Sequence, residues 1–157
     1  MKQLSKRDRF YYEVGEAMAM NNMRCFIKTD TLEVEIHAGE DAFFLEEEED
    51  TAKDALNNPA KFLPLEAVSP HESFKIMEGY IDTVKDTRLQ AVLIQALERK
   101  RPFANFKNIV DNSPLRQQWF DYHDDAYTQL AKEWIEENAG KELKEKIKGL
   151  PGDYITE

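Results

Sequence analysis

Histidine and carboxylate side chains occur together at two places in the chain, a combination typical of acid/base catalysis and of metal binding. His71 stands beside Glu72, and His123 lies in the string FDYHDDAY. Asp121 and Asp125 are four residues apart, so both lie on one helix face, whereas His123 points elsewhere. Because a metal needs more converging ligands than this, the sequence predicts no metal and no cofactor. The alternative is a metal-dependent or acid/base enzyme in which His71, Glu72 and His123 meet nearby carboxylates.

A cluster of basic residues stands out in a chain whose formal net charge is −10. The string ERKRPFANFK contains Arg99, Lys100, Arg101 and Lys107, which we call the basic cluster. A helix C-terminus explains part of the pattern, because positive charge is favourable there. Three consecutive basic residues cannot all serve one helix end equally. We therefore predict a small interaction module that binds a partner through this region, residues 99–107.

The composition favours a protein over a nucleic acid as the partner of the basic cluster, because phosphate attraction rests on basic surface and this chain is acidic. Base stacking also requires exposed aromatic rings. Phe103, Phe106, Ile109 and Val110 recur at helical spacing, which predicts that both phenylalanines pack inward. The acidic segment EEEED, residues 46–50, is a candidate second surface of opposite charge.

Cys25 is the only cysteine, so no internal disulfide can form. It lies on the apolar face of an alternating segment, which predicts a buried and unreactive thiol. No apolar run approaches the roughly 20 residues that span a bilayer. No apolar stretch follows the basic N-terminus as in a secretory signal. We therefore expect a cytoplasmic protein without a membrane segment.

The N-terminal half is predicted to combine a helix with extended segments. Apolar residues at three- and four-residue spacing predict a helix over residues 6–21, which Gly15 weakens by roughly 1 kcal/mol relative to alanine. A third strand is expected at AFFL, residues 42–45. The segment KFLPLEAVSP, residues 61–70, is expected to be extended because Pro64 disfavours helix before it.

The string MRCFIKTDTLEVEIH alternates with period two, which predicts a β-hairpin. A two-residue turn at residues 29–30 pairs Cys25 with Val34. The same register places Arg24 opposite Glu35, where opposite charges stabilise a sheet modestly. Thr-Asp is not a favoured two-residue turn, so a longer loop is the alternative.

The C-terminal half is predicted to be helical. Ser69 and Pro70 form a strong helix start, with the hydroxyl as N-cap and proline in the first turn. Trp119 and Trp134 are close to four turns apart in a long helix that runs to about residue 138, so we expect them on one core stripe. Further helices are expected to begin near Asp86 or Thr87, after Pro102, at Ser113 and, as an exposed helix, at KELKEKIK.

Together these elements predict an α+β fold, in which a small antiparallel β-sheet or hairpin in the N-terminal half packs with a helical C-terminal half. The chain length is that of one domain. We expect the helix, hairpin and acidic loop over residues 1–68, the helical half over 69–148 and a flexible tail over 149–157.

Two long strings carry a resemblance to a known family. They are SPHESFKIMEGYIDTV and RLQAVLIQALERKRPFANFKNIVDNSPLRQQWFDYHDDAYTQLAKEWIEEN. In this order they resemble an uncharacterised bacterial protein family, number 158 of the UPF series, whose function is unassigned. The resemblance covers residues 69–138 and extends loosely over the first 68. It implies a bacterial cytoplasmic protein with an N-terminal α/β segment, an acidic middle and this helical half, and it assigns no catalytic or binding residue.

Overall fold

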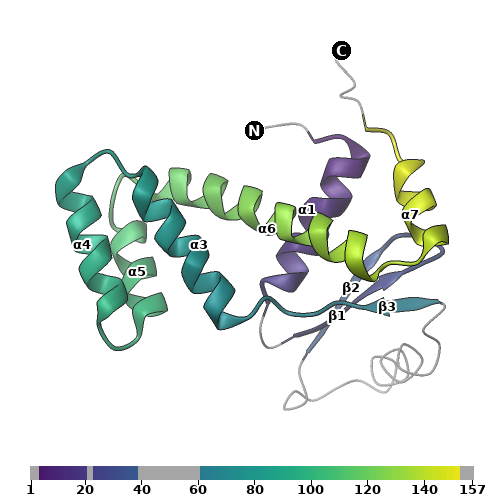
Figure 1. Ribbon diagram of the computed structural model, residues 1–157, viewed down its shortest axis with the longest axis horizontal. Helices are drawn as coiled ribbons and strands as arrows, with labels where there is room; N and C mark the ends of the chain where they lie inside the picture. The colour runs from purple at the N-terminus through teal and green to yellow at the C-terminus, as the bar shows by residue number, and fades with distance from the viewer. Residues whose placement is uncertain (1–3, 21–22, 39–60, 153–157) are drawn as a thin grey trace. The chain divides into compact units, whose positions relative to one another are not determined.

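The computed structural model describes residues 4–20, 23–38 and 61–152 of the chain. It has the predicted α+β fold, with a three-stranded antiparallel sheet in the N-terminal half and a mostly helical C-terminal half (Figure 1). The elements are α1 (Lys6–Met18), β1 (Met23–Lys28), β2 (Val34–Ala38), β3 (Phe62–Pro64), α3 (Pro70–Thr83), α4 (Thr87–Glu98), α5 (Pro102–Asp111), α6 (Arg116–Asn138) and α7 (Lys141–Lys148).

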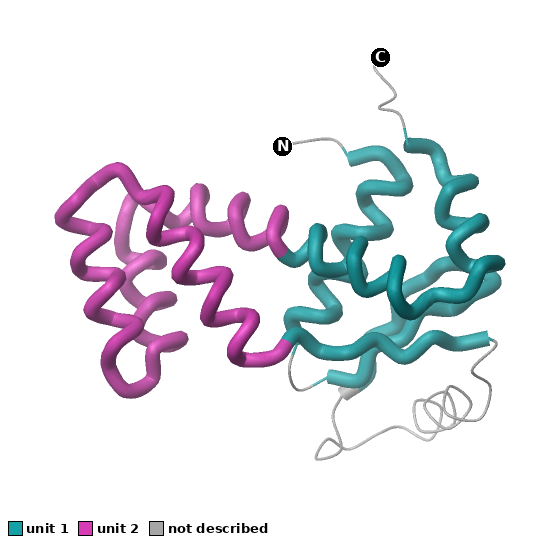
Figure 2. The backbone as a smooth tube through the Cα atoms, in the orientation of Figure 1, with its two compact units in different colours: residues 1–68, 127–157 teal, residues 69–126 magenta. Residues whose placement is uncertain are grey.

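The chain divides into two compact units (Figure 2). Unit 1 comprises residues 1–68 and 127–157, and unit 2 comprises residues 69–126. In sequence terms, unit 2 is therefore inserted into unit 1, and one of the two boundaries falls within α6. The single domain expected from the chain length stays a prediction.

The register of the hairpin differs from the prediction by two residues. Cys25 faces Ile36 instead of Val34, and Arg24 faces His37 instead of Glu35. A shift of two preserves the face on which each side chain lies, because the side-chain period of a strand is two residues. The predicted faces are therefore right, while the predicted pairs are wrong.

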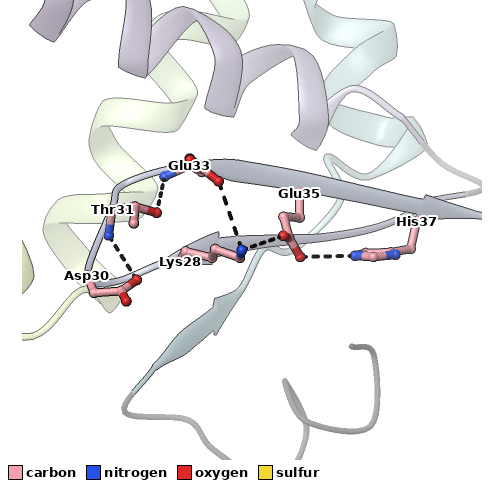
Figure 3. Close-up of polar contacts among 6 residues, drawn as sticks. All are labelled: Lys28, Asp30, Thr31, Glu33, Glu35 and His37. Carbon is pink, nitrogen blue, oxygen red and sulfur yellow. Dashed lines mark hydrogen bonds and ion pairs between the residues drawn. The ribbon is translucent and has the colours of Figure 1, made fainter. Parts of the chain in front are cut away.

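The turn between β1 and β2 explains the shift. The backbone N–H of Lys28 donates to the Glu33 carbonyl at 2.8 Å, and the N–H of Leu32 donates to the Lys28 carbonyl at 2.7 Å. Leu32 takes a left-handed conformation with φ 64°. The Asp30 carboxylate accepts from the Thr31 N–H at 2.9 Å, and the Thr31 hydroxyl accepts from the Glu33 N–H at 3.3 Å (Figure 3). Thr-Asp does not favour a two-residue turn, so the chain takes the longer loop and fixes it with these side chains.

The third strand lies at Phe62–Pro64, within the segment that the sequence predicts to be extended. It pairs antiparallel with β1, so β1 is the central strand and the sheet order is β2-β1-β3. The strand expected at residues 42–45 and the acidic segment at residues 46–50 lie outside the described residues.

Cys25 is buried, as predicted, with 5% of its surface exposed. Its thiol donates a hydrogen bond to the Ala17 carbonyl of α1, with a sulfur-to-oxygen distance of 3.5 Å. Burial raises the pKa of the Cys25 thiol. Because the thiolate is the nucleophile, a raised pKa lowers the reactive fraction at neutral pH.

We therefore expect Cys25 to react slowly with a disulfide-exchange reagent in the folded protein and rapidly in denaturant. Since the pKa is raised, the rate in the folded protein should stay low until the pH exceeds the ordinary range of a cysteine. Release of the chromophoric thiol measures the rate at each pH. Rapid, stoichiometric labelling of the native protein at neutral pH would contradict the buried position.

Helices α1 and α6 pack closely at Gly15. A Cβ atom at this position would lie 2.8 Å from the Tyr127 carbonyl oxygen and 3.0 Å from the backbone nitrogen of Thr128. Glycine is therefore required here by the close approach of two backbones, a reason that the sequence does not show.

Helix α7 is not the exposed helix that the sequence predicts. Leu143 and Ile147 are four residues apart on one face, and both side chains are buried. The charged residues of KELKEKIK occupy the remaining faces. One of them, Lys146, donates from its ammonium group to the Thr29 carbonyl at 3.0 Å.

Arg7 joins the start of α1 to the segment that follows α7. Its guanidinium donates to the carbonyls of Lys148 at 2.6 Å and Leu150 at 3.0 Å. Its backbone N–H donates to the Pro151 carbonyl at 3.1 Å. The start of α1 thus supplies donors for carbonyl groups at the end of α7. In return, the segment after α7 supplies an acceptor for an N–H group in the first turn of α1 that has no partner within its own helix.

The helix starts of unit 2 largely follow the sequence. The Ser69 hydroxyl accepts from the Glu72 N–H, and Asp86 caps α4 in the same way. The long helix begins at Arg116 instead of directly after Ser113. The Ser113 hydroxyl donates to the Val110 carbonyl at 2.9 Å and accepts from the Leu115 N–H at 3.2 Å, so it stabilises the preceding turn.

The core of unit 2 is centred on an aromatic group contributed by α3, α5 and α6. Tyr80 contacts the rings of Phe106 and Trp119 at centroid distances of 6.2 and 5.2 Å. Trp134 belongs to unit 1 and is partly exposed. The two tryptophans therefore do not share one core stripe, because the two parts of α6 pack within different units. The buried members of this core are Met77, Tyr80, Ile81, Val84, Leu93, Leu97, Phe106, Val110 and Leu115.

Candidate partner-binding site

The basic cluster lies at the connection between α4 and α5. Helix α4 ends at Glu98 and has no basic residue in its last turn, and only Arg99 occupies its C-cap. Lys100 and Arg101 follow the helix, so favourable interaction with a helix C-terminus accounts for Arg99 alone. All four side chains of the basic cluster are exposed. Within the part of the chain that the structure describes, none of them forms an ion pair.

Backbone hydrogen bonding fixes the course of this connection. The Asn105 side-chain amide donates to the Lys100 carbonyl at 2.8 Å, and the Asn105 N–H donates to the Arg101 carbonyl at 3.0 Å. Arg101 has φ 58° and ψ 56°, a left-handed conformation that costs a residue with a Cβ atom roughly 1–2 kcal/mol. The connection is therefore a defined loop that presents three consecutive cations to solvent.

The two phenylalanines of the string have different environments. Phe106 is 1% exposed, whereas Phe103 is 42% exposed. The prediction that both pack inward is wrong for Phe103, because it lies in the first turn of α5, where the core ends. Its ring contacts only the edge of the core, with Phe74 at a centroid distance of 6.4 Å. Phe103 and Lys107 are four residues apart, so the exposed ring and the cation share one face of α5.

The charged residues of this surface are all positive. Residues 99–110 contain four basic residues and no acidic one. Arg101, the N-cap of α5, makes no side-chain hydrogen bond to the first turn. The positive end of the α5 dipole therefore adds to the charge of the basic cluster. The combination suits a ligand that carries negative charge beside an apolar group.

The histidines receive no comparable support. His71 is exposed in the first turn of α3. His123 is partly buried, with its Nδ1 3.4 Å from the Asp124 carboxylate and its ring 5.4 Å from that of Trp119. Tyr122 directly precedes His123 in the sequence, and its hydroxyl lies beside Gly79 of α3. Gly79 is eight residues from His71, a distance of about 12 Å along the helix.

Metal coordination lacks a ligand set in the described ranges 4–20, 23–38 and 61–152. They contain no group of three or more histidine, cysteine, aspartate or glutamate side chains that could hold a metal ion. The enzyme built on His71, Glu72 and His123 therefore stays a prediction without geometric support.

The sequence prediction does not include a chain of polar contacts on the hairpin (Figure 3). The Lys28 ammonium lies 2.9 Å from one Glu35 carboxylate oxygen, and His37 Nε2 lies 3.2 Å from the other. Burial raises the pKa of Glu35, but hydrogen bonds from Lys28 and His37 outweigh it and leave the pKa below its usual range. The hydrogen bond to Glu35 raises the pKa of Lys28. The alternation of the strands places Lys28, Glu35 and His37 on one face, but the predicted register pairs Glu35 with Arg24 and therefore does not bring Lys28 to Glu35.

The fold and the site define an α+β protein with an exposed basic and aromatic surface at one helix connection. No helix within the described residues has both the length and the apolar composition needed to cross a membrane. The chain belongs to the uncharacterised protein family UPF0158, whose family model matches residues 27–155. The match confirms the resemblance seen in the helical half and extends it into the sheet.

A curated relative carries the same family name. The chain is 28% identical to the UPF0158 protein PA5073 of Pseudomonas aeruginosa over 108 residues, which are 67% of this chain and 71% of the relative. No solved structure matches the chain.

Proposed function

We propose that this protein is a cytoplasmic interaction module that binds a protein partner through the basic cluster and Phe103. One observation carries the proposal. Four exposed cations without an ion pair among the described residues lie within four residues of a half-exposed phenylalanine in the sequence, in a chain that is acidic as a whole. The buried free thiol of Cys25 is consistent with a reducing compartment.

The partner surface that fits this site carries carboxylates around an apolar side chain. Arginine and aromatic residues are enriched at the centres of protein interfaces, where they contribute most of the binding energy. The cations would steer an acidic partner and exclude basic ones. A nucleic acid fits less well, because the site offers one exposed ring instead of a row, and the acidic chain repels phosphate.

Reversing the three loop charges, Arg99→Glu, Lys100→Glu and Arg101→Glu together, tests the proposal. We expect the variant to stay folded, because exposed substitutions usually change the free energy of unfolding by less than about 0.5 kcal/mol each. We expect it to lose the proteins that the wild type captures from a bacterial lysate. Binding of the wild type should also weaken as salt is added, because exposed charge pairs are screened.

A matched control reverses three exposed cations elsewhere: Lys85→Glu, Arg88→Glu and Lys141→Glu. It changes the net charge by the same amount and should retain capture. Thermal melts verify the fold of both variants, and quantitative mass spectrometry compares the captured proteins. The proposal fails if the loop variant is folded and captures the same proteins as the control, or if the captured component is nucleic acid that nuclease removes.

A further inference from the structure

Strand β2 is an edge of the sheet, and one of its sides has no strand partner among the described residues. The Lys28 N–H bonds to the Glu33 carbonyl, so the backbone groups of alternate residues, Glu35 and His37, also point toward β1. The N–H and carbonyl groups of Val34 and Ile36 therefore point outward. In the described part of the chain, no backbone hydrogen bond reaches them.

The side chains of β2 do not protect this edge. Natural edge strands are usually shielded by proline, by charged residues such as lysine, or by a bulge. Strand β2 has the sequence VEIHA, with no proline, lysine or bulge, and its one charged side chain, Glu35, is bound to Lys28 and His37. The central residue, Ile36, is instead 42% exposed. The opposite edge is different, because β3 has three residues and ends at Pro64.

We infer that β2 is the site at which a second copy of this chain binds, by antiparallel pairing of the two β2 strands about a twofold axis at Ile36. The sequence of the strand is complementary to itself in this register. Ile36 faces Ile36 of the second copy, so two exposed apolar side chains cover each other. Glu35 faces His37 of the second copy, and the same pair repeats across the axis.

The environment of His37 supports this occupant. Its side chain is about nine-tenths buried, and its Nε2 pairs with the Glu35 carboxylate of the same strand. Directly opposite residues in an antiparallel pair have Cβ atoms about 4.5–5.5 Å apart, so the second copy places its Glu35 opposite His37, a pair of complementary polar side chains.

The register makes a sharp prediction for engineered cysteines. Ile36 and its counterpart form a hydrogen-bonded pair with a Cα separation of about 5.5 Å, within the range that a disulfide bridges. Val34 faces residue 38 of the second copy, so the two Val34 positions lie four residues, about 13 Å, apart. Under mild oxidation, Ile36→Cys should form a reducible covalent dimer, and Val34→Cys should not. Non-reducing electrophoresis and mass spectrometry of the linked peptide report the outcome.

Sedimentation velocity of the unmodified protein provides the independent measurement. We expect a dimer that dissociates on dilution, and we expect Ile36→Lys to be monomeric at concentrations where the wild type is dimeric. A thermal melt verifies that this exposed substitution leaves the fold intact. The inference is overturned if the wild type is monomeric at every concentration, if Ile36→Lys remains dimeric, or if Val34→Cys links as readily as Ile36→Cys. It does not depend on the basic cluster, so the two proposals fail separately.

Discussion

Replacing Phe106 with alanine should lower the free energy of unfolding of unit 2 by about 3–5 kcal/mol, the usual cost of deleting a buried aromatic side chain. Phe106 is among the most completely buried side chains, and its ring contacts those of Tyr80 and Trp119 at centroid distances of 6.2 and 4.8 Å. Truncation removes these contacts and leaves a cavity that rigid neighbours fill only partly. Urea denaturation followed by tryptophan fluorescence measures the change.

The matched control is Phe103→Ala, the same substitution three residues earlier in the same helix. Because Phe103 is 42% exposed, we expect a loss well below that of Phe106→Ala. Partner capture should nevertheless fall, because the substitution removes the apolar part of the proposed site. If both variants lose the same stability, Phe103 belongs to the core, and the proposed site has no aromatic anchor.

The second large effect is expected at Gly15. In an exposed helix interior, glycine to alanine stabilises by about 1 kcal/mol. Here the new Cβ atom would lie 2.8 Å from the Tyr127 carbonyl oxygen and 2.9 Å from its carbon, and neither backbone atom can rotate away. We therefore expect the opposite sign, a loss of about 1–3 kcal/mol from overpacking. Larger residues should destabilise further, since α1 and α6 must then separate.

Gly149→Ala serves as the control for Gly15→Ala. Gly149 has φ −73° and ψ −13°, which alanine adopts without strain, and the nearest atom to an added Cβ is 3.4 Å away. Alanine there should be neutral or stabilising by up to about 1 kcal/mol, because it restricts the unfolded chain. Parallel urea titrations compare the two variants. Equal stability of Gly15→Ala and the wild type would mean that the two helices tolerate a wider spacing.

The features predicted correctly depend on neighbours within a few residues. Ser69 and Asp86 cap helices because a hydroxyl or carboxylate one turn before an apolar stripe bonds the free N–H groups. The fold class follows from the change between a period of two and a period of 3.6. The hairpin register was missed because it depends on a turn in which Leu32 takes a positive φ, and no local rule selects leucine for that conformation.

In the candidate site, too, the features that depend on neighbouring residues are predictable from the sequence, and those that depend on distant residues are not. Consecutive cations in an acidic chain identify the basic cluster from sequence alone. Helical spacing also predicts which face of α5 is apolar, but it does not show where along that face the core ends, so the exposure of Phe103 was missed. Gly15 was misjudged for a related reason. The atoms that exclude a Cβ there belong to Tyr127 and Thr128, more than a hundred residues away in the sequence.

The insertion of unit 2 into unit 1 has a consequence for the order of events during protein synthesis. Translation delivers α1 and the three strands first, then every residue of unit 2, and only afterwards residues 127–157. The sheet and α1 therefore emerge without the second part of α6 and without α7. Nascent chains generally fold domain by domain as they emerge. In this chain unit 2 has all of its residues while unit 1 is still waiting for its last helices, so the unit that begins first on the ribosome is completed last.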